Sequence, residues 1–243
     1  MPKERGKEKG EKTEIERGIT YREEDVLLRR EIGKEVGREF KGYEVVEELD
    51  LKGAEADYYL LRKEDNLYFL KLYRKGYKPK DVEKIVELSR KFPEHIVKIE
   101  EYGEYEGRLY EIQEYVKYSN LKDFVRKYGI EGERFREVVK EMVECLSVLH
   151  RNGVIHRDIK PQNILVREKE PLDLILTDFG ISSIMEEDVS KVLTGLKGTF
   201  LYSAPEVFSG YFGKESDYWS LGIVLLEVIY GKHPYIEVPN EVY

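Results

Sequence analysis

Residues 156–180, which begin HRDIKPQN and end ILTDFG, decide the fold and the chemistry that we expect of this chain. They place Asp158, Asn163 and Asp178 on polar segments between short apolar runs. Carboxylate and carbonyl oxygens suit Mg²⁺, and because the ion keeps several waters, few protein ligands suffice. One carboxylate can then accept a hydroxyl proton while the other two groups hold the metal on a triphosphate, which is the division of roles that phosphoryl transfer needs.

The motifs H-R-D-x-x-x-x-N and D-F-G occur in that order, so this stretch resembles the catalytic core of eukaryotic-type (Hanks-type) serine/threonine protein kinases. The resemblance implies that Asp158 is the catalytic base and that Asn163 and Asp178 bind the metal. Lys160 matches a lysine that lies near the γ-phosphate in serine/threonine kinases, which favours Ser and Thr of protein substrates as acceptors. The alternative is a chance occurrence of both motifs, and their order, with strand-like runs between them, argues against it.

The same resemblance implies an α+β fold with two lobes, between which ATP would bind with Mg²⁺ or Mn²⁺. Residues 43–116 are expected to form the hinge and a small lobe of about five antiparallel strands with one helix. Residues 117–243 are expected to form a mostly helical large lobe that stops after its central helix. Residues 1–42 carry a charged tail, and from about residue 20 to residue 40 a weak helical pattern predicts a helix that packs on the small lobe or serves in docking or regulation.

Lys71 lies in the strand-like run NLYFLKLYRKG, and the resemblance identifies it as the lysine that contacts the α- and β-phosphates of ATP. Such a lysine needs a glutamate partner, for which Glu83 on the following helix is the prediction and Glu87 the reserve. The alternative is that both glutamates are solvated helix charges. The preceding loop, residues 51–56, keeps only Gly53 of the G-x-G-x-x-G pattern that lets backbone N–H groups approach phosphates.

Two bulky side chains depart from the family pattern at the adenine site. Phe69 stands where a small alanine normally packs on adenine, and Tyr58 stands where a valine is usual. Either the pocket is rearranged, or the assumed strand register is wrong by one residue. We therefore expect these rings to affect ATP binding more than the fold.

The segment IQEYVKYSNL resembles the hinge between the lobes. By alignment Gln113 is the gatekeeper at the back of the adenine pocket, Glu114 offers a backbone carbonyl to adenine, and Val116 offers a backbone N–H. The ribose has two candidate partners, Asn120 and Asp123. The residues assigned to nucleotide binding are therefore Gly53, Lys71, Glu114, Val116, Leu165 and Asp178.

The segment after Asp178 resembles an activation segment closed by the pattern GTxxYxAPE. Arg157, beside the catalytic base, matches the arginine that grips an activation-loop phosphate through a bidentate contact. Thr194 is the first candidate acceptor of that phosphate and Ser190 the second. The alternative is that both are ordinary polar residues of a loop.

Three further residues match structural positions of the family. Thr199 would hydrogen-bond near the catalytic base, Glu206 closes the activation segment, and Asp217 would receive backbone N–H groups of the catalytic loop. The run ESDYWSLGIVLLEVIYGKHPY resembles the central helix of the large lobe, and the sequence ends soon after it at Tyr243. Because an apolar flank of this helix would lie bare, we expect further helices or a partner to cover it.

Composition narrows the class of protein. The chain has 41 basic and 49 acidic residues, a net charge of -8 and no basic block, so a nucleic-acid partner is not expected. No apolar run reaches a membrane-spanning length, and the charged start cannot be a secretory signal. The single cysteine, Cys145, fits a reducing cytoplasm and is expected to be a buried, inert thiol. The charged content of 37% and the scarcity of glutamine are typical of thermophile surfaces.

Two rival functions remain at this stage. A pseudokinase or scaffold with weak or altered nucleotide binding is favoured by Phe69, Tyr58 and the degraded phosphate loop. It is opposed by the intact Asp158, Asn163 and Asp178, which a pure scaffold does not need. A small-molecule kinase of related fold is opposed by Lys160 and by the APE-type closure.

Overall fold

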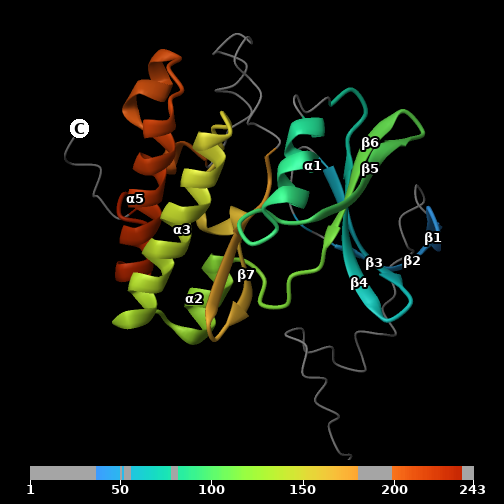
Figure 1. The fold of residues 1–243 in the computed structure, drawn as a ribbon, viewed down its shortest axis with the longest axis horizontal. Helices are drawn as coiled ribbons and strands as arrows, with labels where there is room; N and C mark the ends of the chain where they lie inside the picture. The colour runs from blue at the N-terminus through green and yellow to red at the C-terminus, as the bar shows by residue number, and fades with distance from the viewer. Residues whose placement is uncertain (1–36, 50, 52–55, 78–81, 180–198, 237–243) are drawn as a thin grey trace, which may run out of the picture.

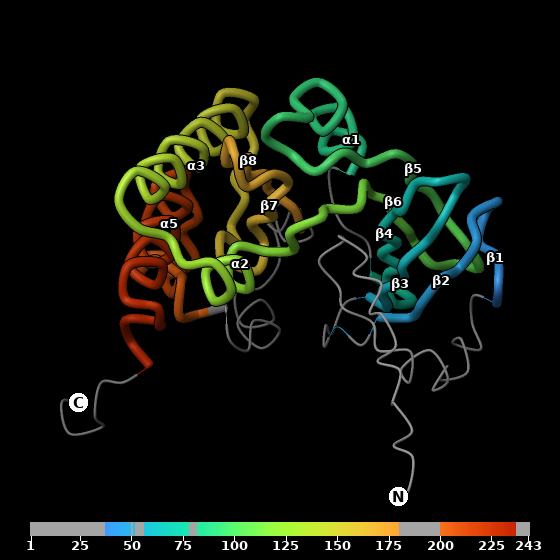
Figure 2. Tube along the Cα trace, turned by 90° about the horizontal axis from the view of Figure 1, so that it is seen from below, coloured from blue at the N-terminus to red at the C-terminus, as the bar shows by residue number. Residues whose placement is uncertain are grey.

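The protein has two lobes joined by one extended segment. The computed structural model describes residues 37–49, 51, 56–77, 82–179 and 199–236. Figure 1 shows a curled sheet with a helix beside it in one half of the molecule and mostly helices in the other. Figure 2, turned by 90°, shows the chain near residues 115–120 crossing between the halves. The predicted two-lobed α+β fold is therefore confirmed.

The small lobe is built on an antiparallel sheet with the strand order β1-β2-β3-β4-β6-β5. Lys71 of β4 faces Tyr58 on one neighbouring strand and Glu111 on the other. Side chains that face each other across antiparallel strands lie on the same face of the sheet, so these three share one face. The strands are β1 (Glu39–Phe40), β2 (Tyr43–Leu49), β3 (Ala56–Lys63), β4 (Asn66–Tyr73), β5 (Ile99–Tyr105) and β6 (Arg108–Glu114).

The alternation of side chains along β4 and β6 explains which face is polar. Leu70, Leu72, Tyr110 and Ile112 are buried together in the core of the small lobe. Because successive side chains of a strand point to opposite faces, the residues between them must face the other way, toward the large lobe. The sheet thereby turns Lys71 toward the large lobe, on the face that we call the cleft face.

Helix α1 (Val82–Lys91) is the single described helix of the small lobe and lies beside the sheet, on the side of the large lobe (Figure 1). Its buried residues are Ile85, Val86, Leu88 and Ser89, which recur at helical spacing on one face. Glu83 and Glu87 are one turn apart on the other face, and both side chains are exposed.

The large lobe packs its helices against a short two-stranded sheet. Its main core cluster includes Met142, Leu146 and Leu149 of the longest helix together with Leu174 and Leu176 of the sheet. The elements are α2 (Leu121–Tyr128), α3 (Glu133–Arg151), η1 (Pro161–Asn163), β7 (Ile164–Lys169), β8 (Leu172–Leu176), η2 (Thr199–Tyr202), η3 (Pro205–Ser209) and α5 (Lys214–Tyr230). Cys145 is fully buried in this core, and burial raises the pKa of its thiol, as the expectation of an inert thiol requires.

One detail of the predicted small lobe is wrong. Residues 39 and 40, the end of the expected helix, pair as strand β1 with β2 because Phe40 is buried against the sheet, in contact with Tyr105 and Tyr110. The sheet therefore has six described strands rather than five. The predicted phosphate-loop residue Gly53 and the predicted phosphorylation sites Ser190 and Thr194 lie outside the described residues.

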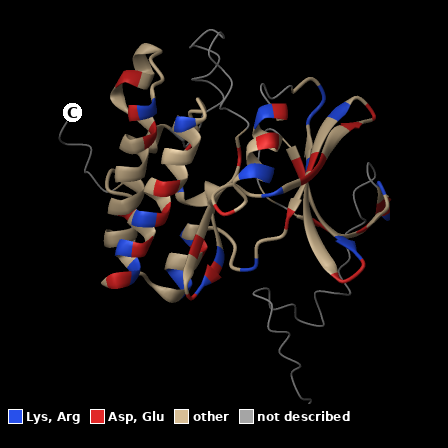
Figure 3. Ribbon diagram, viewed as in Figure 1, with Lys and Arg blue, Asp and Glu red and all other residues tan. Residues whose placement is uncertain are grey.

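The described residues carry mixed charges on both lobes and a partly exposed apolar helix. Figure 3 shows Lys and Arg interspersed with Asp and Glu on both lobes. Among the described helices, none combines the length and the apolar character that a membrane span requires. Trp219, Ile229 and Tyr230 of α5 are exposed, so this helix does present an apolar surface. Which segment or partner covers it stays a prediction.

Candidate active site

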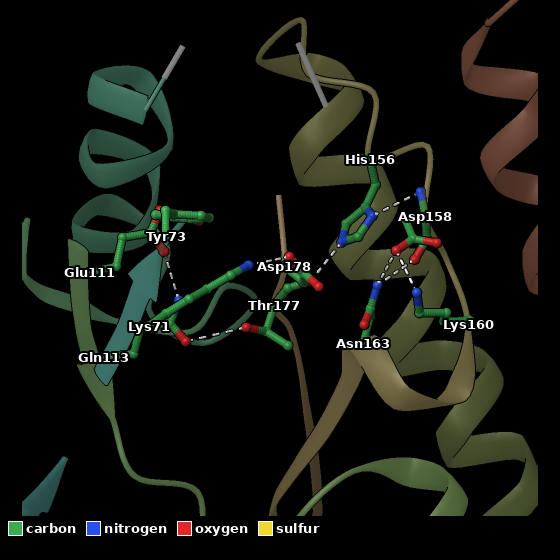
Figure 4. A network of polar contacts seen from close by, with 10 residues as sticks. All are labelled: Lys71, Tyr73, Glu111, Gln113, His156, Asp158, Lys160, Asn163, Thr177 and Asp178. Atoms are coloured by element: carbon green, nitrogen blue, oxygen red, sulfur yellow. Dashed lines mark hydrogen bonds and ion pairs between the residues drawn. The ribbon is translucent and has the colours of Figure 1, made fainter. Parts of the chain in front are cut away.

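The catalytic loop brings a buried carboxylate, an amide and an ammonium group together. The Asn163 side chain donates to both the backbone carbonyl and the Oδ2 atom of Asp158, each at 2.8 Å. Lys160 Nζ lies 2.7 Å from the same Oδ2 atom. Asp158 is only 3% exposed, yet its Oδ1 atom has no hydrogen-bond partner among the described residues. Lys160 and Asn163 therefore fix the carboxylate of Asp158 through one oxygen and leave the other oxygen without a hydrogen bond (Figure 4).

Asp217 fixes the backbone of this loop through hydrogen bonds. Its carboxylate accepts hydrogen bonds from the backbone N–H groups of His156 at 2.9 Å and Arg157 at 2.8 Å, which are the contacts that the resemblance predicted. A third contact joins it to His150 Nε2 at 2.8 Å. Arg157 has a φ of 68°, a conformation that is uncommon outside glycine and persists only where the surroundings hold it. The hydrogen bond from the Arg157 N–H to buried Asp217 of α5 stabilises this conformation.

Lys71 and Asp178 form a buried ion pair between the two lobes. Lys71 Nζ lies 2.5 Å from Asp178 Oδ1, and Lys71 is 4% exposed. The predicted ion pair between Lys71 and Glu83 is absent from this structure, because the apolar face of α1 is buried and both Glu83 and Glu87 are exposed on its other face. The apolar residues Ile85, Val86 and Leu88 indicate this buried face in the sequence, but no local pattern shows whether the opposite face would be turned toward Lys71.

The charges of the cleft shift the acidities of its groups. Burial alone would raise the pKa of Asp178, but the Lys71 ammonium and its hydrogen bond outweigh burial and hold this pKa below its usual value. Burial raises the pKa of Asp158, and the neighbouring Lys160 offsets only part of that rise. Burial opposes the charge of Lys71, but Asp178, Tyr73 and Glu111 outweigh it and raise its pKa well above the usual value. The two aspartates therefore differ in acidity, as a base and a metal ligand should.

A chain of polar contacts that the sequence analysis missed runs from the sheet to the catalytic loop. Tyr73 donates from its hydroxyl to Glu111 at 2.8 Å, and the Gln113 amide donates to the other oxygen of Glu111 at 3.0 Å. Gln113 in turn accepts from the Thr177 hydroxyl at 3.4 Å. Thr177 also contacts the catalytic loop, because its carbonyl oxygen lies 3.0 Å from His156 Nε2 (Figure 4).

A signal for this chain was present in the sequence. In β6, RLYEIQE, Glu111 and Gln113 alternate with Tyr110 and Ile112, a pattern that predicts a strand with one polar face. The expected gatekeeper is thus a buried amide whose two ends are both bonded.

The rings of Phe69 and Tyr58 do lie together on the cleft face. Their centroids are 5.6 Å apart, and Tyr58 faces Lys71 across the strands. The two rings that depart from the family pattern therefore share one place on the sheet, and whether they crowd a bound adenine stays a prediction.

The opposite side of the expected nucleotide site is apolar. Leu165 of β7 packs against Val116 of the hinge in one small cluster. Glu114 is engaged through its carboxylate, which accepts from the Lys98 N–H at 2.8 Å. Asn120 caps α2 by accepting from the Asp123 N–H at 3.0 Å, and its amide donates to the Asp123 carboxylate at 3.0 Å, so both candidate ribose partners are engaged at a helix end.

The remaining residues of the activation region have structural contacts. The Arg157 guanidinium lies 5.4 Å from the centroid of the Phe212 ring. Glu206 accepts from the Ser216 hydroxyl at 2.9 Å, which ties the end of the segment to α5. Of Thr199 the structure describes only that its backbone begins η2.

The donor set in the cleft fits a magnesium ion. Asp178 offers a carboxylate kept ionised by Lys71, and Asn163 offers an amide oxygen while its nitrogen is held by Asp158. No group of three or more His, Cys, Asp or Glu suited to a metal occurs among the described residues. Mg²⁺ usually takes one or two protein oxygens and completes its coordination with water and phosphate oxygens. The two oxygen donors here therefore suit a Mg²⁺ ion that binds together with a nucleotide.

These features define a protein with the two-lobed fold and catalytic groups of a phosphotransferase. The chain matches the protein kinase domain over residues 62–242 and therefore belongs to the protein kinase family. This places the HRD and DFG motifs and Lys71 within the matched region.

The curated relatives are kinases by name, and one of the three reported below is named a serine/threonine protein kinase. The chain is 35% identical over 144 residues to mouse (Mus musculus) NUAK family SNF1-like kinase 1, covering 58% of this chain and 21% of that protein. It is 35% identical over 175 residues to mouse calcium/calmodulin-dependent protein kinase type IV, covering 70% and 37%. It is 33% identical over 151 residues to rice (Oryza sativa subsp. indica) serine/threonine protein kinase OSK3, covering 60% and 29%. The chain thus spans well under half the length of these relatives.

Solved structures give the same fold. Rad53 residues 1–466, whose crystal structure contains AMP-PNP, matches with a TM-score of 0.67 and 26% identity, covering 83% of this chain and 52% of that one. The kinase PK-1 of Cydia pomonella granulovirus matches with a TM-score of 0.64 over 83% of this chain and 73% of that one; at 22% identity it supports the fold alone.

Proposed function

We propose that this protein transfers the γ-phosphate of ATP to serine and threonine hydroxyls of protein substrates. The observation that carries the proposal is the Oδ1 atom of Asp158. Among the described residues this buried atom has no hydrogen-bond partner, while Lys160 and Asn163 bind the other oxygen of the same carboxylate. Family membership and the names of the curated relatives support the choice of protein acceptors over small molecules.

Each polar group in the cleft then has a defined task. Asp158 accepts the proton of the incoming hydroxyl, and its raised pKa brings it closer to the range in which a base works well. Lys160 lies beside it and stabilises charge on the transferring group. Asn163 and Asp178 would hold Mg²⁺, which when bound neutralises phosphate charge, and Lys71 would orient the phosphates.

The direct test is autophosphorylation with γ-labelled ATP and Mg²⁺, run at 25 °C and warm. We compare wild type with Asp178→Asn and use Asp65→Asn, a change of the same kind at an exposed turn, as the matched control. Label on serine or threonine in wild type and Asp65→Asn, lost in Asp178→Asn or on chelation of Mg²⁺, is the expected result. Mapping the label tests Thr194 and Ser190.

Two outcomes would contradict the proposal. Transfer to a small molecule with no labelled protein, when generic protein substrates are present, would indicate the small-molecule class. Absence of transfer together with absence of a thermal shift on adding Mg-ATP would indicate a scaffold, because a ligand that binds the folded state must stabilise it.

A further inference from the structure

The cleft face of the small lobe carries a buried carboxylate that the proposed function does not use. Glu111 is 8% exposed and lies directly across from Lys71 in the pairing of β4 with β6. Directly opposed side chains of antiparallel strands have Cβ atoms about 5 Å apart, so the two charges share one patch of the sheet. A buried carboxylate is costly unless it is hydrogen-bonded and paired with a positive charge.

Glu111 is fixed by its neighbours. One carboxylate oxygen accepts from Tyr73 and the other from Gln113, and both donors are neutral. Among the described residues, Lys71 is the only lysine or arginine that is buried, and strand pairing places it directly across from Glu111, so it is the buried cation available to balance that carboxylate. Tyr73 connects the two groups, since Lys71 Nζ lies 4.8 Å from the centroid of its ring while its hydroxyl holds Glu111.

The glutamates on α1 are in no position to do this. Glu83 and Glu87 are exposed, and the buried face of α1 consists of Ile85, Val86, Leu88 and Ser89. Lys71 is paired instead with Asp178, the group that the proposed function assigns to the metal. Once Asp178 serves the metal, Lys71 needs another carboxylate to keep it oriented toward the phosphates, and that carboxylate must already face the cleft.

We propose that Glu111, held by Tyr73 and Gln113, is the positioning residue for Lys71 during phosphate binding, in the role expected of a glutamate on α1. The inference rests on the proposed function, since it assigns the orientation of the lysine that binds the phosphates. It places the anchor on a strand of the same sheet as the lysine, so the pair does not depend on where α1 sits.

The test separates positioning from pocket integrity by comparing two ligands. Affinities for ATP and for adenosine are measured by calorimetry on the full chain, with and without Mg²⁺, alongside kcat/KM for transfer. Glu111→Gln keeps the shape and can still accept from Tyr73, and Tyr73→Phe removes the hydrogen bond that fixes Glu111. Glu104→Gln, at an exposed position of β5, is the control for loss of one carboxylate from the same sheet.

We expect Glu111→Gln to lower kcat/KM about tenfold or more and to weaken ATP binding while adenosine binding stays at the wild-type value, because misplaced catalytic groups cost rate steeply. Tyr73→Phe should shift both quantities in the same direction by less. Glu104→Gln should match wild type, and Glu83→Gln should stay within a few-fold of it.

Several results would overturn the inference. ATP binding and transfer unchanged in Glu111→Gln would show that Lys71 needs no strand anchor, and a large loss in Glu83→Gln would return the role to α1. Equal loss of ATP and adenosine would show a merely structural role, and tighter ATP binding would show that Glu111 only repels phosphate. Wild type that binds ATP but transfers nothing contradicts the proposed function alone, whereas wild type that binds no ATP contradicts both.

Discussion

The two lobes fix their catalytic groups in different ways. On the large-lobe side, Asp158 sits in a short loop whose backbone N–H groups are bound by one buried aspartate, Asp217. On the small-lobe side, strand pairing positions Lys71, and its neighbours on the sheet are the residues directly opposite it, Tyr58 and Glu111.

This difference explains why the large-lobe motif is intact and the small-lobe pattern is altered. In the loop, Asp158, Lys160 and Asn163 contact one another within a few residues of chain, so a change at one position disturbs the others. In the sheet, the pairing with Lys71 can be supplied from any strand or helix that presents a carboxylate to the cleft.

The comparison is tested most strongly at the base itself. Asp158→Asn keeps the shape of the side chain but removes the acceptor charge, and we expect phosphoryl transfer to fall by about 10²–10⁴-fold. The affinity for ATP and the melting temperature should stay close to those of wild type, because the small-lobe contacts are untouched. Steady-state kinetics and a thermal melt, with Asp65→Asn as the control, measure both; retained transfer would refute the assignment of Asp158.

The second prediction concerns the support of the loop. Asp217→Ala leaves the His156 and Arg157 N–H groups without their acceptor, and the unfolding free energy should fall by about 3 kcal/mol, since bonds to a buried charge are costly to lose. Glu215→Ala, exposed in the same first turn of α5, should cost well under about 1 kcal/mol. Chemical denaturation of both variants makes the comparison, and equal effects would show that Asp217 is no anchor.

The same contrast accounts for what the sequence could predict. Asp158, Asn163 and Asp178 were assigned from motifs whose spacing is local, and the structure places Asn163 on Asp158. Lys71 was found because it interrupts an apolar strand ahead of a helix. These assignments needed no knowledge of how distant segments pair.

The partner of Lys71 could not be predicted in this way. Its ion-pair partner Asp178 lies 107 residues further along the chain, and the register that brings Glu111 opposite Lys71 joins β4 to β6, two strands separated along the chain by α1 and β5. Residues 39–40 were misjudged for a related reason, since the burial of Phe40 between Tyr105 and Tyr110 overrides a weak helical pattern.

A third prediction sharpens the small-lobe side of the comparison. Phe69→Ala should open the adenine site beside Tyr58 and lower the KM for ATP roughly tenfold, the scale on which small changes in pocket volume act. Tyr68→Ala, which removes a half-buried ring from the same strand on the opposite face, is the matched control and should leave the KM unchanged. An unchanged KM in Phe69→Ala would show that the ring does not restrict the nucleotide.

The smallest expected effect is a shift of the acid limb of kcat/KM along the pH axis. It tests whether Lys160 controls the pKa of Asp158. Burial raises the pKa of Asp158, and Lys160 lowers it part of the way back. Asp158 acts as a base only when ionised, so transfer must fall as the pH drops through this raised pKa. In Lys160→Met the lowering influence is gone, the pKa of Asp158 rises further, and the acid limb of kcat/KM must move toward neutral pH, whatever happens to the plateau. Lys122→Met, exposed on α2, should leave the limb in place. A limb that stays fixed in Lys160→Met would mean that the ion pair at 2.7 Å does not govern the base.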